Sequence, residues 1–195
     1  MAMPPVRERR WARGLLALAG WRVDVVLPPG PKCVIAVYPH TSNWDFVVGY
    51  LGKLAAGLPL HFVGKHTLFR GPLGPLLRRM GGIPVDRRAA AGLIGALVRE
   101  LEARPWMWLA IAPEGTRAKV PHLKSGFYRI ALAAKVPVGL AFIDWRERVV
   151  GLRDYLVPTG DEEADLARMR AAWAGKIGKR PVLAAPIRFR RSRRA

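Results

Sequence analysis

The chain has little cysteine, little acid and no long apolar run. Cys33 is the one cysteine among 195 residues, which excludes an internal disulfide framework and a zinc centre built from several cysteines. Asp and Glu total 14 against 33 Lys and Arg, so the formal net charge is +19. An excess of this size indicates an anionic partner: nucleic acid, an anionic membrane surface, or an acidic substrate or carrier.

No stretch reaches the roughly 18 uncharged apolar residues that a membrane-spanning helix requires. The longest apolar run near the start, residues 14–21, is too short for one. Residues 21–24 (Trp-Arg-Val-Asp) stand where a secretory signal would need small residues for cleavage. We therefore expect a cytoplasmic protein, peripheral to the cytoplasmic face of a membrane. Its 51% of hydrophobic residues is typical of a folded domain.

The first 24 residues predict an amphipathic helix. Trp11, Leu15 and Leu18 recur at helical spacing and define one face, while Arg9 and Arg13 fall on the opposite face. Two interpretations are open for the apolar face: it packs on the protein's own core, or it lies in a bilayer interface.

The last eight residues, 188–195, contain five arginines and predict a basic tail. Such a tail attracts anionic lipid or nucleic acid, and it can equally remain solvated without a partner.

Between these ends, residues 25–187 alternate strand-like and helix-like segments. Strands are expected at 32–38, 60–63, 83–85, 106–112 and 136–143, and helices at 44–54, 89–103, 125–135 and 161–177. This alternation predicts a single-domain α/β sandwich with a largely parallel central sheet flanked by helices. Ligands of such sheets bind beyond the carboxyl ends of the strands, so the loops after Tyr38, Val63 and Ala112 are the candidate site.

The loop after the first of these strands contains His40 and Asp45. On one helix, residues five apart differ by about 140° and share no face. The two side chains can meet if the helix starts among Thr41, Ser42 and Asn43, which are good N-cap residues. Asp45 would then orient the imidazole, and His40 would remove a proton from a hydroxyl. Alternatively, the two are a turn histidine and a helix-start acid without catalytic function.

Cations and a glycine follow three later strands. Gly115 permits a tight turn, Arg117 offers a planar fork for phosphate or carboxylate, and Glu114 can orient that guanidinium or bind a ligand hydroxyl. Lys124 adds a cation at a predicted helix start. Further cations, Lys65 and Arg87, follow the strands at 60–63 and 83–85. A structural Glu–Arg pair and a solvated basic face are the alternatives.

Four blocks in this order resemble the glycerolipid acyltransferase superfamily, and within it the 1-acylglycerol-3-phosphate (lysophosphatidate) type. The blocks are His-x4-Asp at 40–45, Gly-Ile-Pro-Val-Asp-Arg at 82–87, Pro-Glu-Gly-Thr-Arg at 113–117, and Val-Pro-Val at 136–138. The resemblance implies a glycerol-3-phosphate acyltransferase-like fold. It also implies transfer of a fatty acyl group from an acyl thioester, on coenzyme A or acyl carrier protein, to a lysolipid hydroxyl.

The resemblance further assigns roles to residues. It makes His40 the general base and Asp45 its orienting partner, with no metal and no cofactor beyond the thioester co-substrate. The acceptor site takes in Arg87 and Arg117 on the phosphate, Glu114, Gly115 and Thr116 around it, and Lys65 and Lys124 by a looser match. Residues 136–138 correspond to the block associated with acyl binding.

Departures from the family pattern leave the acceptor open. Ala112 stands where Phe is common, Ala118 where Ser is common, and the fourth block continues as Gly139-Leu140. The acceptor is therefore a lysophospholipid or, alternatively, a glycolipid or amino lipid without phosphate. A thioesterase, with water as acceptor, is a further alternative. Nucleic-acid binding would rest on charge alone and gives the His40–Asp45 spacing no function, so we expect no nucleic-acid partner.

Overall fold

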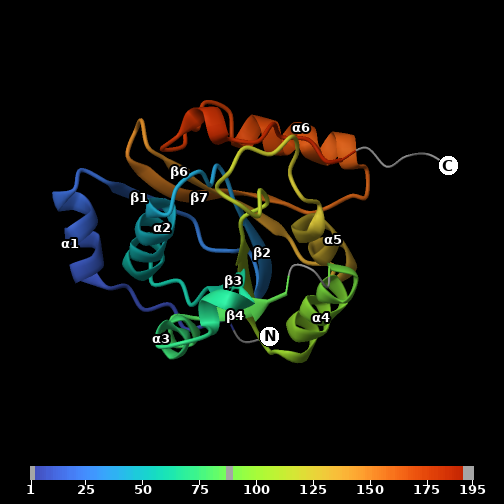
Figure 1. Ribbon diagram of the computed structural model, residues 1–195, viewed down its shortest axis with the longest axis horizontal. Helices are drawn as coiled ribbons and strands as arrows, with labels where there is room; N and C mark the ends of the chain where they lie inside the picture. Colours follow the sequence, from blue (N-terminus) through green and yellow to red (C-terminus); the bar gives the residue numbers. More distant parts are fainter. Residues whose placement is uncertain (1–2, 87–89, 191–195) are drawn as a thin grey trace.

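The computed structural model describes residues 3–86 and 90–190 (Figure 1). In those ranges seven strands form one sheet in the order β1-β7-β6-β2-β5-β3-β4. The strands are β1 (Arg22–Val25), β2 (Lys32–Val37), β3 (His61–Lys65), β4 (Gly82–Val85), β5 (Met107–Ile111), β6 (Val138–Asp144) and β7 (Val149–Leu156). The β6–β7 pairing is antiparallel and the other pairings of this sheet are parallel. The predicted α/β fold with a largely parallel sheet is confirmed.

Helices cover both faces of the sheet (Figure 1). They are α1 (Arg10–Leu18), α2 (Trp44–Ala55), α3 (Leu73–Arg79), α4 (Ala90–Ala103), α5 (Gly126–Ala133) and α6 (Glu162–Ala172), with short 3-10 turns η1 (His66–Phe69) and η2 (Pro181–Leu183). One core cluster joins α4, α5 and α6 to the sheet, and a second joins α1 and α2 to the opposite face.

The central strand β2 alternates between these two cores. Val34 and Ala36 belong to the cluster under α4, α5 and α6, while Cys33 and Ile35 lie on the opposite face. All four are at most 1% exposed. A parallel strand covered on both faces is apolar at successive positions, which is why the run at 32–38 was recognisable in the sequence.

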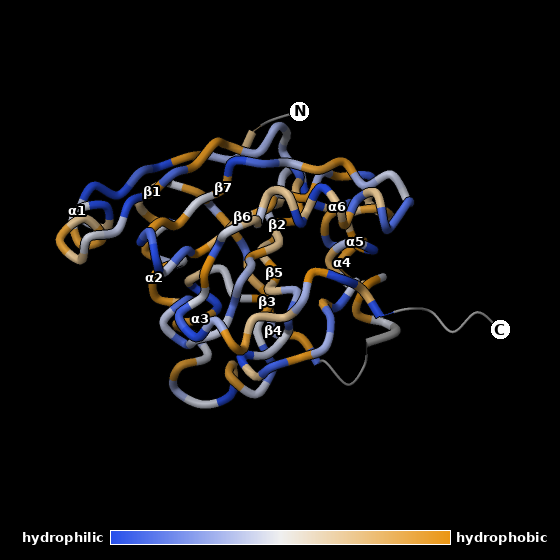
Figure 2. Tube along the Cα trace, turned by 90° about the horizontal axis from the view of Figure 1, so that it is seen from above, coloured by the Kyte–Doolittle hydropathy of each residue, from blue (hydrophilic) through white to orange (hydrophobic). Residues whose placement is uncertain are grey.

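The N-terminal helix turns its predicted apolar face outward. Trp11, Leu15 and Leu18 are 58%, 50% and 87% exposed, whereas Ala12 and Leu16 are the buried residues that pack toward α2. Figure 2 shows α1 at the periphery, with apolar residues along its outer edge. The interpretation that this face packs on the protein's own core is therefore wrong.

The boundaries of the predicted terminal segments also shift. Strand β1 spans the boundary expected at residue 24 and pairs with β7. At the other end, Phe189 is 7% exposed and packs edge-on against Phe127 and at a tilt against Tyr128, so the folded body continues past residue 187. Residues 191–195 lie outside the described residues. Within residues 3–86 and 90–190, no helix combines the length and apolar character needed to cross a bilayer.

Candidate active site

The candidate site forms where the chain leaves β2 and enters α2. Asp45, the second residue of α2, turns its side chain back toward the loop, and its Oδ2 accepts hydrogen bonds from the backbone N–H groups of Thr41 (2.7 Å) and Ser42 (2.8 Å). Asn43 occupies the N-cap position, but its side chain makes no capping hydrogen bond. The carboxylate itself therefore closes the turn that joins strand to helix.

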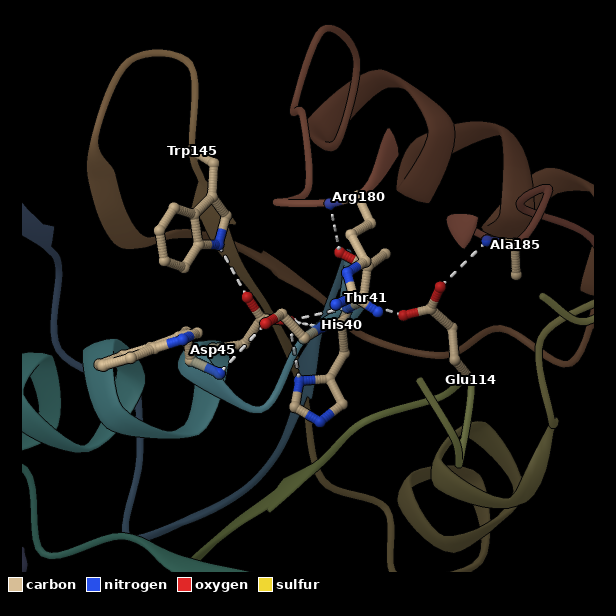
Figure 3. Close-up of polar contacts among 9 residues, drawn as sticks. His40, Thr41, Asp45, Glu114, Trp145, Arg180 and Ala185 are labelled. Atoms are coloured by element: carbon tan, nitrogen blue, oxygen red, sulfur yellow. Dashed lines mark hydrogen bonds and ion pairs between the residues drawn. The ribbon is translucent and has the colours of Figure 1, made fainter. Parts of the chain in front are cut away.

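This turn brings His40 to Asp45. The imidazole Nδ1 lies 3.5 Å from Asp45 Oδ2, and the two side chains are 15% and 0% exposed (Figure 3). The separation exceeds that of a good hydrogen bond, and substrate-free enzymes commonly hold their acid–base groups at such distances. The structure thus brings together the imidazole and the carboxylate that the sequence paired.

A third side chain, which no motif of the sequence selects, holds the same carboxylate. Trp145, in the turn between β6 and β7, donates its indole N–H to Asp45 Oδ1 at 2.7 Å. Figure 3 shows Asp45 between Trp145 and His40. Asp45 Oδ2 therefore accepts the loop N–H groups and faces the imidazole, while Oδ1 accepts the indole N–H.

Glu114 ties the His40 loop to the C-terminal segment. Its carboxylate accepts the backbone N–H of His40 (2.5 Å) on one oxygen and that of Ala185 (3.0 Å) on the other. The residue is 1% exposed, and burial raises the pKa of its carboxyl, with the charge of Asp45 adding to the rise and the two backbone donors opposing it. Both oxygens thus face backbone donors inside the protein.

An apolar pocket of about 140 Å³ follows α2 away from this pair; we call it the apolar pocket. Asp45, Gly49 and Lys53 succeed one another along it at four-residue steps. The Lys53 ammonium donates to the carbonyl of Met80 at 2.7 Å, and burial lowers the pKa of this amine to about 8. The remaining lining residues are Val37, His40, Phe46, Tyr50, Leu60, Phe62, Ala110, Ile111, Ala112 and Ile143.

His40 also lines a second, larger pocket of about 330 Å³, the cationic pocket. This pocket collects four of the predicted acceptor residues: Lys65, Gly115, Thr116 and Arg117. The other lining residues are Asn43, Phe46, Phe62, Val63, Gly64, Leu68, Phe69, Leu73, Leu77 and Ala112. His40 therefore stands where a mainly apolar pocket and a pocket with two cations meet.

The remaining predicted residues lie elsewhere. Lys124 lines a separate pocket of about 350 Å³ with His122 and Arg190, on another side of Gly115. Gly115, between the two pockets, has φ +66°, a left-handed conformation that favours glycine, and a Cβ there would come within 2.9 Å of the Lys124 ammonium. Arg87 lies outside the described residues.

The fourth block lies in the core of the sheet. Val136 and Val138 are 7% and 0% exposed, and Val138 pairs with Val34 of β2. Both belong to the cluster under α4, α5 and α6. In this chain the block therefore supports β6 beside the central strand.

Comparisons with known proteins fit this geometry. The family model described as Acyltransferase matches residues 26–139. Among solved structures, the crystal structure of the 1-acyl-sn-glycerophosphate (LPA) acyltransferase PlsC from Thermotoga maritima is similar, with a TM-score of 0.55 at 20% identity. The similarity covers 84% of this chain and 73% of that one, and it concerns the fold. No curated protein sequence matches the chain.

Proposed function

Because the chain belongs to the acyltransferase family, we propose that it moves a fatty acyl group from an acyl thioester to a hydroxyl of a lysophospholipid. The acceptor that fits best is 1-acylglycerol-3-phosphate. The observation that carries the proposal is the position of His40, which lines both the apolar pocket and the cationic pocket with Lys65 and Arg117. Acyl transfer to the hydroxyl of a phosphate-bearing lipid needs an apolar pocket for the acyl chain and a cationic pocket for the phosphate, both beside the same base.

In the proposed reaction, Lys65 and Arg117 bind the phosphate of the acceptor and so position its hydroxyl at His40. Charge-assisted contacts of this kind contribute roughly 1.5 to 3 kcal/mol each. The imidazole Nε2 removes the hydroxyl proton as the oxygen attacks the thioester carbonyl. The new C–O bond forms, the C–S bond breaks, and the imidazolium returns the proton to the leaving thiolate. A positioned base of this kind contributes about 10² to 10⁴ in rate.

Asp45 supports this cycle in two ways. Its negative charge, 3.5 Å from Nδ1, stabilises the imidazolium that forms when His40 takes the proton. Its hydrogen bonds from Thr41, Ser42 and Trp145 hold the carboxylate in place while the charge on the imidazole changes. Because a thioester is already activated, no covalent acyl–enzyme step is needed.

The donor's hydrocarbon chain would occupy the apolar pocket along α2, with the thioester carbonyl near His40. The donor carrier is coenzyme A or acyl carrier protein, and the net charge of +19 suits either anionic carrier. The outward face of α1, with Trp11, Leu15 and Leu18, supports peripheral attachment to an anionic membrane. At the cytoplasmic face of the membrane the protein would encounter both carriers.

The deciding experiment is an acceptor panel with one labelled acyl donor, presented on coenzyme A and on acyl carrier protein. The panel contains lysophosphatidate, the same monoacylglycerol without phosphate, a glycolipid, an amino lipid and water alone. We expect label in diacylated phospholipid from lysophosphatidate, with at least a tenfold lower kcat/KM for the phosphate-free analogue, from loss of the charge-assisted contacts. Label that enters the glycolipid or amino lipid instead, or that is released as free fatty acid, contradicts the assignment of the acceptor.

A further inference from the structure

The segment after β3 exposes a row of leucines. Leu68 of η1 and Leu73 and Leu76 of α3 are 52%, 63% and 53% exposed. Figure 1 shows α3 at the edge of the molecule, beside the edge strand β4. Single exposed leucines are common, but three within nine residues form a patch, and such patches mark interaction surfaces. We call this patch the η1–α3 surface.

The buried side chain of Phe69 anchors the segment that carries these leucines. Phe69, between Leu68 and α3, is 7% exposed, and three glycines close around it. A Cβ on Gly64 or Gly82 would come within 2.8 Å of the Phe69 ring, and one on Gly74 within 2.2 Å of the Phe69 carbonyl oxygen. Close packing around Phe69 holds the inner side of the segment η1–α3 against the protein. The leucines on its outer side are therefore exposed in the folded protein.

The same surface is basic. Arg70, Arg78 and Arg79 are exposed around the leucines, and the Arg78 guanidinium lies 5.5 Å from the Phe69 ring centroid. In the sequence, no acidic residue occurs between Asp45 and Asp86, a stretch that contains five lysines and arginines. Leucine side chains surrounded by arginines match the two layers of an anionic membrane surface, namely its acyl boundary and its headgroups.

The surface is continuous with the cationic pocket. Leu68 and Leu73 line that pocket together with His40, Lys65 and Arg117. Two of the three exposed leucines thus lie at the rim of the cavity that contains the base and the cations. A lipid that entered across this rim would keep its hydrocarbon chain against leucine while its headgroup reached the cations.

We propose that the η1–α3 surface docks on an anionic lipid bilayer, so that the lysolipid acceptor passes from the membrane into the cationic pocket over Leu68 and Leu73. This inference rests on the proposed function for the identity of the lipid that enters. It places a second contact with the membrane at the pocket itself, in addition to the outward face of α1.

A single reporter can test contact at this surface. Cys33 is 0% exposed, so a Leu76→Cys variant carries one accessible thiol for an environment-sensitive fluorophore. We expect a blue shift and quenching by membrane-embedded quenchers when vesicles of phosphatidylcholine with phosphatidylglycerol are added. Val182→Cys, at a valine that is 75% exposed in η2, is the matched control and should show neither change. An unshifted label on Leu76→Cys overturns the proposal.

Partition into the same vesicles, measured by co-sedimentation, gives the energetic test. Leu73→Gln/Leu76→Gln should lower the partition coefficient about tenfold or more, since two leucines lose their contact with lipid. Arg78→Gln/Arg79→Gln should lower it about fivefold per arginine, with a weaker effect at high salt. Val157→Gln/Val182→Gln, at valines that are 70% and 75% exposed, is the control, and melting curves verify that each variant is folded. Unchanged partition for both test variants refutes docking at this surface and leaves α1 as the anchor.

These measurements use no acyl donor, so they are independent of the chemistry. Acyl transfer is measured separately, with the acceptor dispersed in neutral detergent micelles. Membrane docking without transfer to lysophospholipid would contradict the proposed acceptor and leave the docking surface intact. Suppose instead that acyl transfer occurs in micelles but partition into vesicles does not depend on Leu73, Leu76, Arg78 or Arg79. That result would contradict the docking surface and leave the proposed acceptor intact.

Discussion

The indole N–H of Trp145 donates to Asp45 Oδ1 at 2.7 Å, across 100 residues of sequence. Trp145 is itself held by an edge-on contact with Trp21, at a centroid distance of 4.9 Å, and by the Lys179 ammonium 4.4 Å from its ring. The turn between β6 and β7 therefore takes part in orienting the carboxylate beside His40.

Trp145→Phe keeps an aromatic ring against Trp21 but removes the hydrogen bond to Asp45. We expect kcat to fall roughly tenfold, since one charge-assisted hydrogen bond is worth about 1.5 to 3 kcal/mol and only part of it bears on imidazole orientation. The KM values for donor and acceptor should stay within about twofold. A purely structural function for Trp145 would instead lower the melting temperature and leave kcat per folded molecule unchanged.

His40→Ala should lower kcat by at least the 10² to 10⁴ typical of a lost general base, with the fold retained. Asp45→Asn should also lower kcat, because the neutral amide cannot stabilise an imidazolium. Steady-state acyl transfer with a labelled thioester measures both. His61→Ala is the matched control, since His61 interacts with Arg104 and Trp106 and lines neither pocket. Turnover near the wild-type level in His40→Ala would refute the catalytic assignment.

Arg117→Ala should raise the acceptor KM by about tenfold or more and the donor KM far less, since Arg117 lies in the cationic pocket. Lys119→Ala, at an exposed cation two residues away, is the control for the general loss of positive charge. Equal increases of both KM values in Arg117→Ala would contradict the assignment of Arg117 to the acceptor phosphate. A partial restoration by Arg117→Lys would fit a phosphate ligand, because lysine keeps the charge without the fork.

The lowered pKa of Lys53 makes a prediction for stability against pH. In the folded protein this amine has a pKa of about 8, against 10.5 in the unfolded chain, so the unfolded state binds more protons between these values. The free energy of unfolding should therefore rise as pH increases from about 8 to about 10.5, relative to Lys53→Met. Urea unfolding at several pH values measures this, with Lys119→Met giving the background slope. A wild-type advantage that falls over this window would contradict the burial of the charge.

The sequence predicts the central sheet well because its strands are short apolar runs buried on both sides. The runs expected at 32–38 and 106–112 appear as β2 and β5, paired in parallel at the centre. Strands β1 and β7 were not expected, since Arg22–Val25 carries two charged residues and the exposed positions of β7 include Arg153 and Asp154. The identity of a half-exposed strand is set by its pairing partner, which local periodicity does not reveal.

The candidate site also contains residues that the local sequence predicts and residues that only long-range contacts bring in. The local pair His40 and Asp45 follows from spacing and turn chemistry, because the bend between strand and helix is encoded within six residues. Trp145 bonds to Asp45, and Ala185 bonds to Glu114, from segments far along the chain, and the residues next to them in the sequence give no sign of these contacts. Glu114 could be selected by its motif, but its orientation toward backbone donors depends on where the C-terminal segment lies.

The shared carboxylate of Glu114 has a practical consequence for how this protein is handled. Since the backbone of Ala185 and that of His40 are bridged by one buried side chain, the segment just after η2 is coupled to the base although nearly 150 residues separate them. A shortened product that lacks Ala185 and the residues after it loses this bridge, and we expect its turnover to be altered.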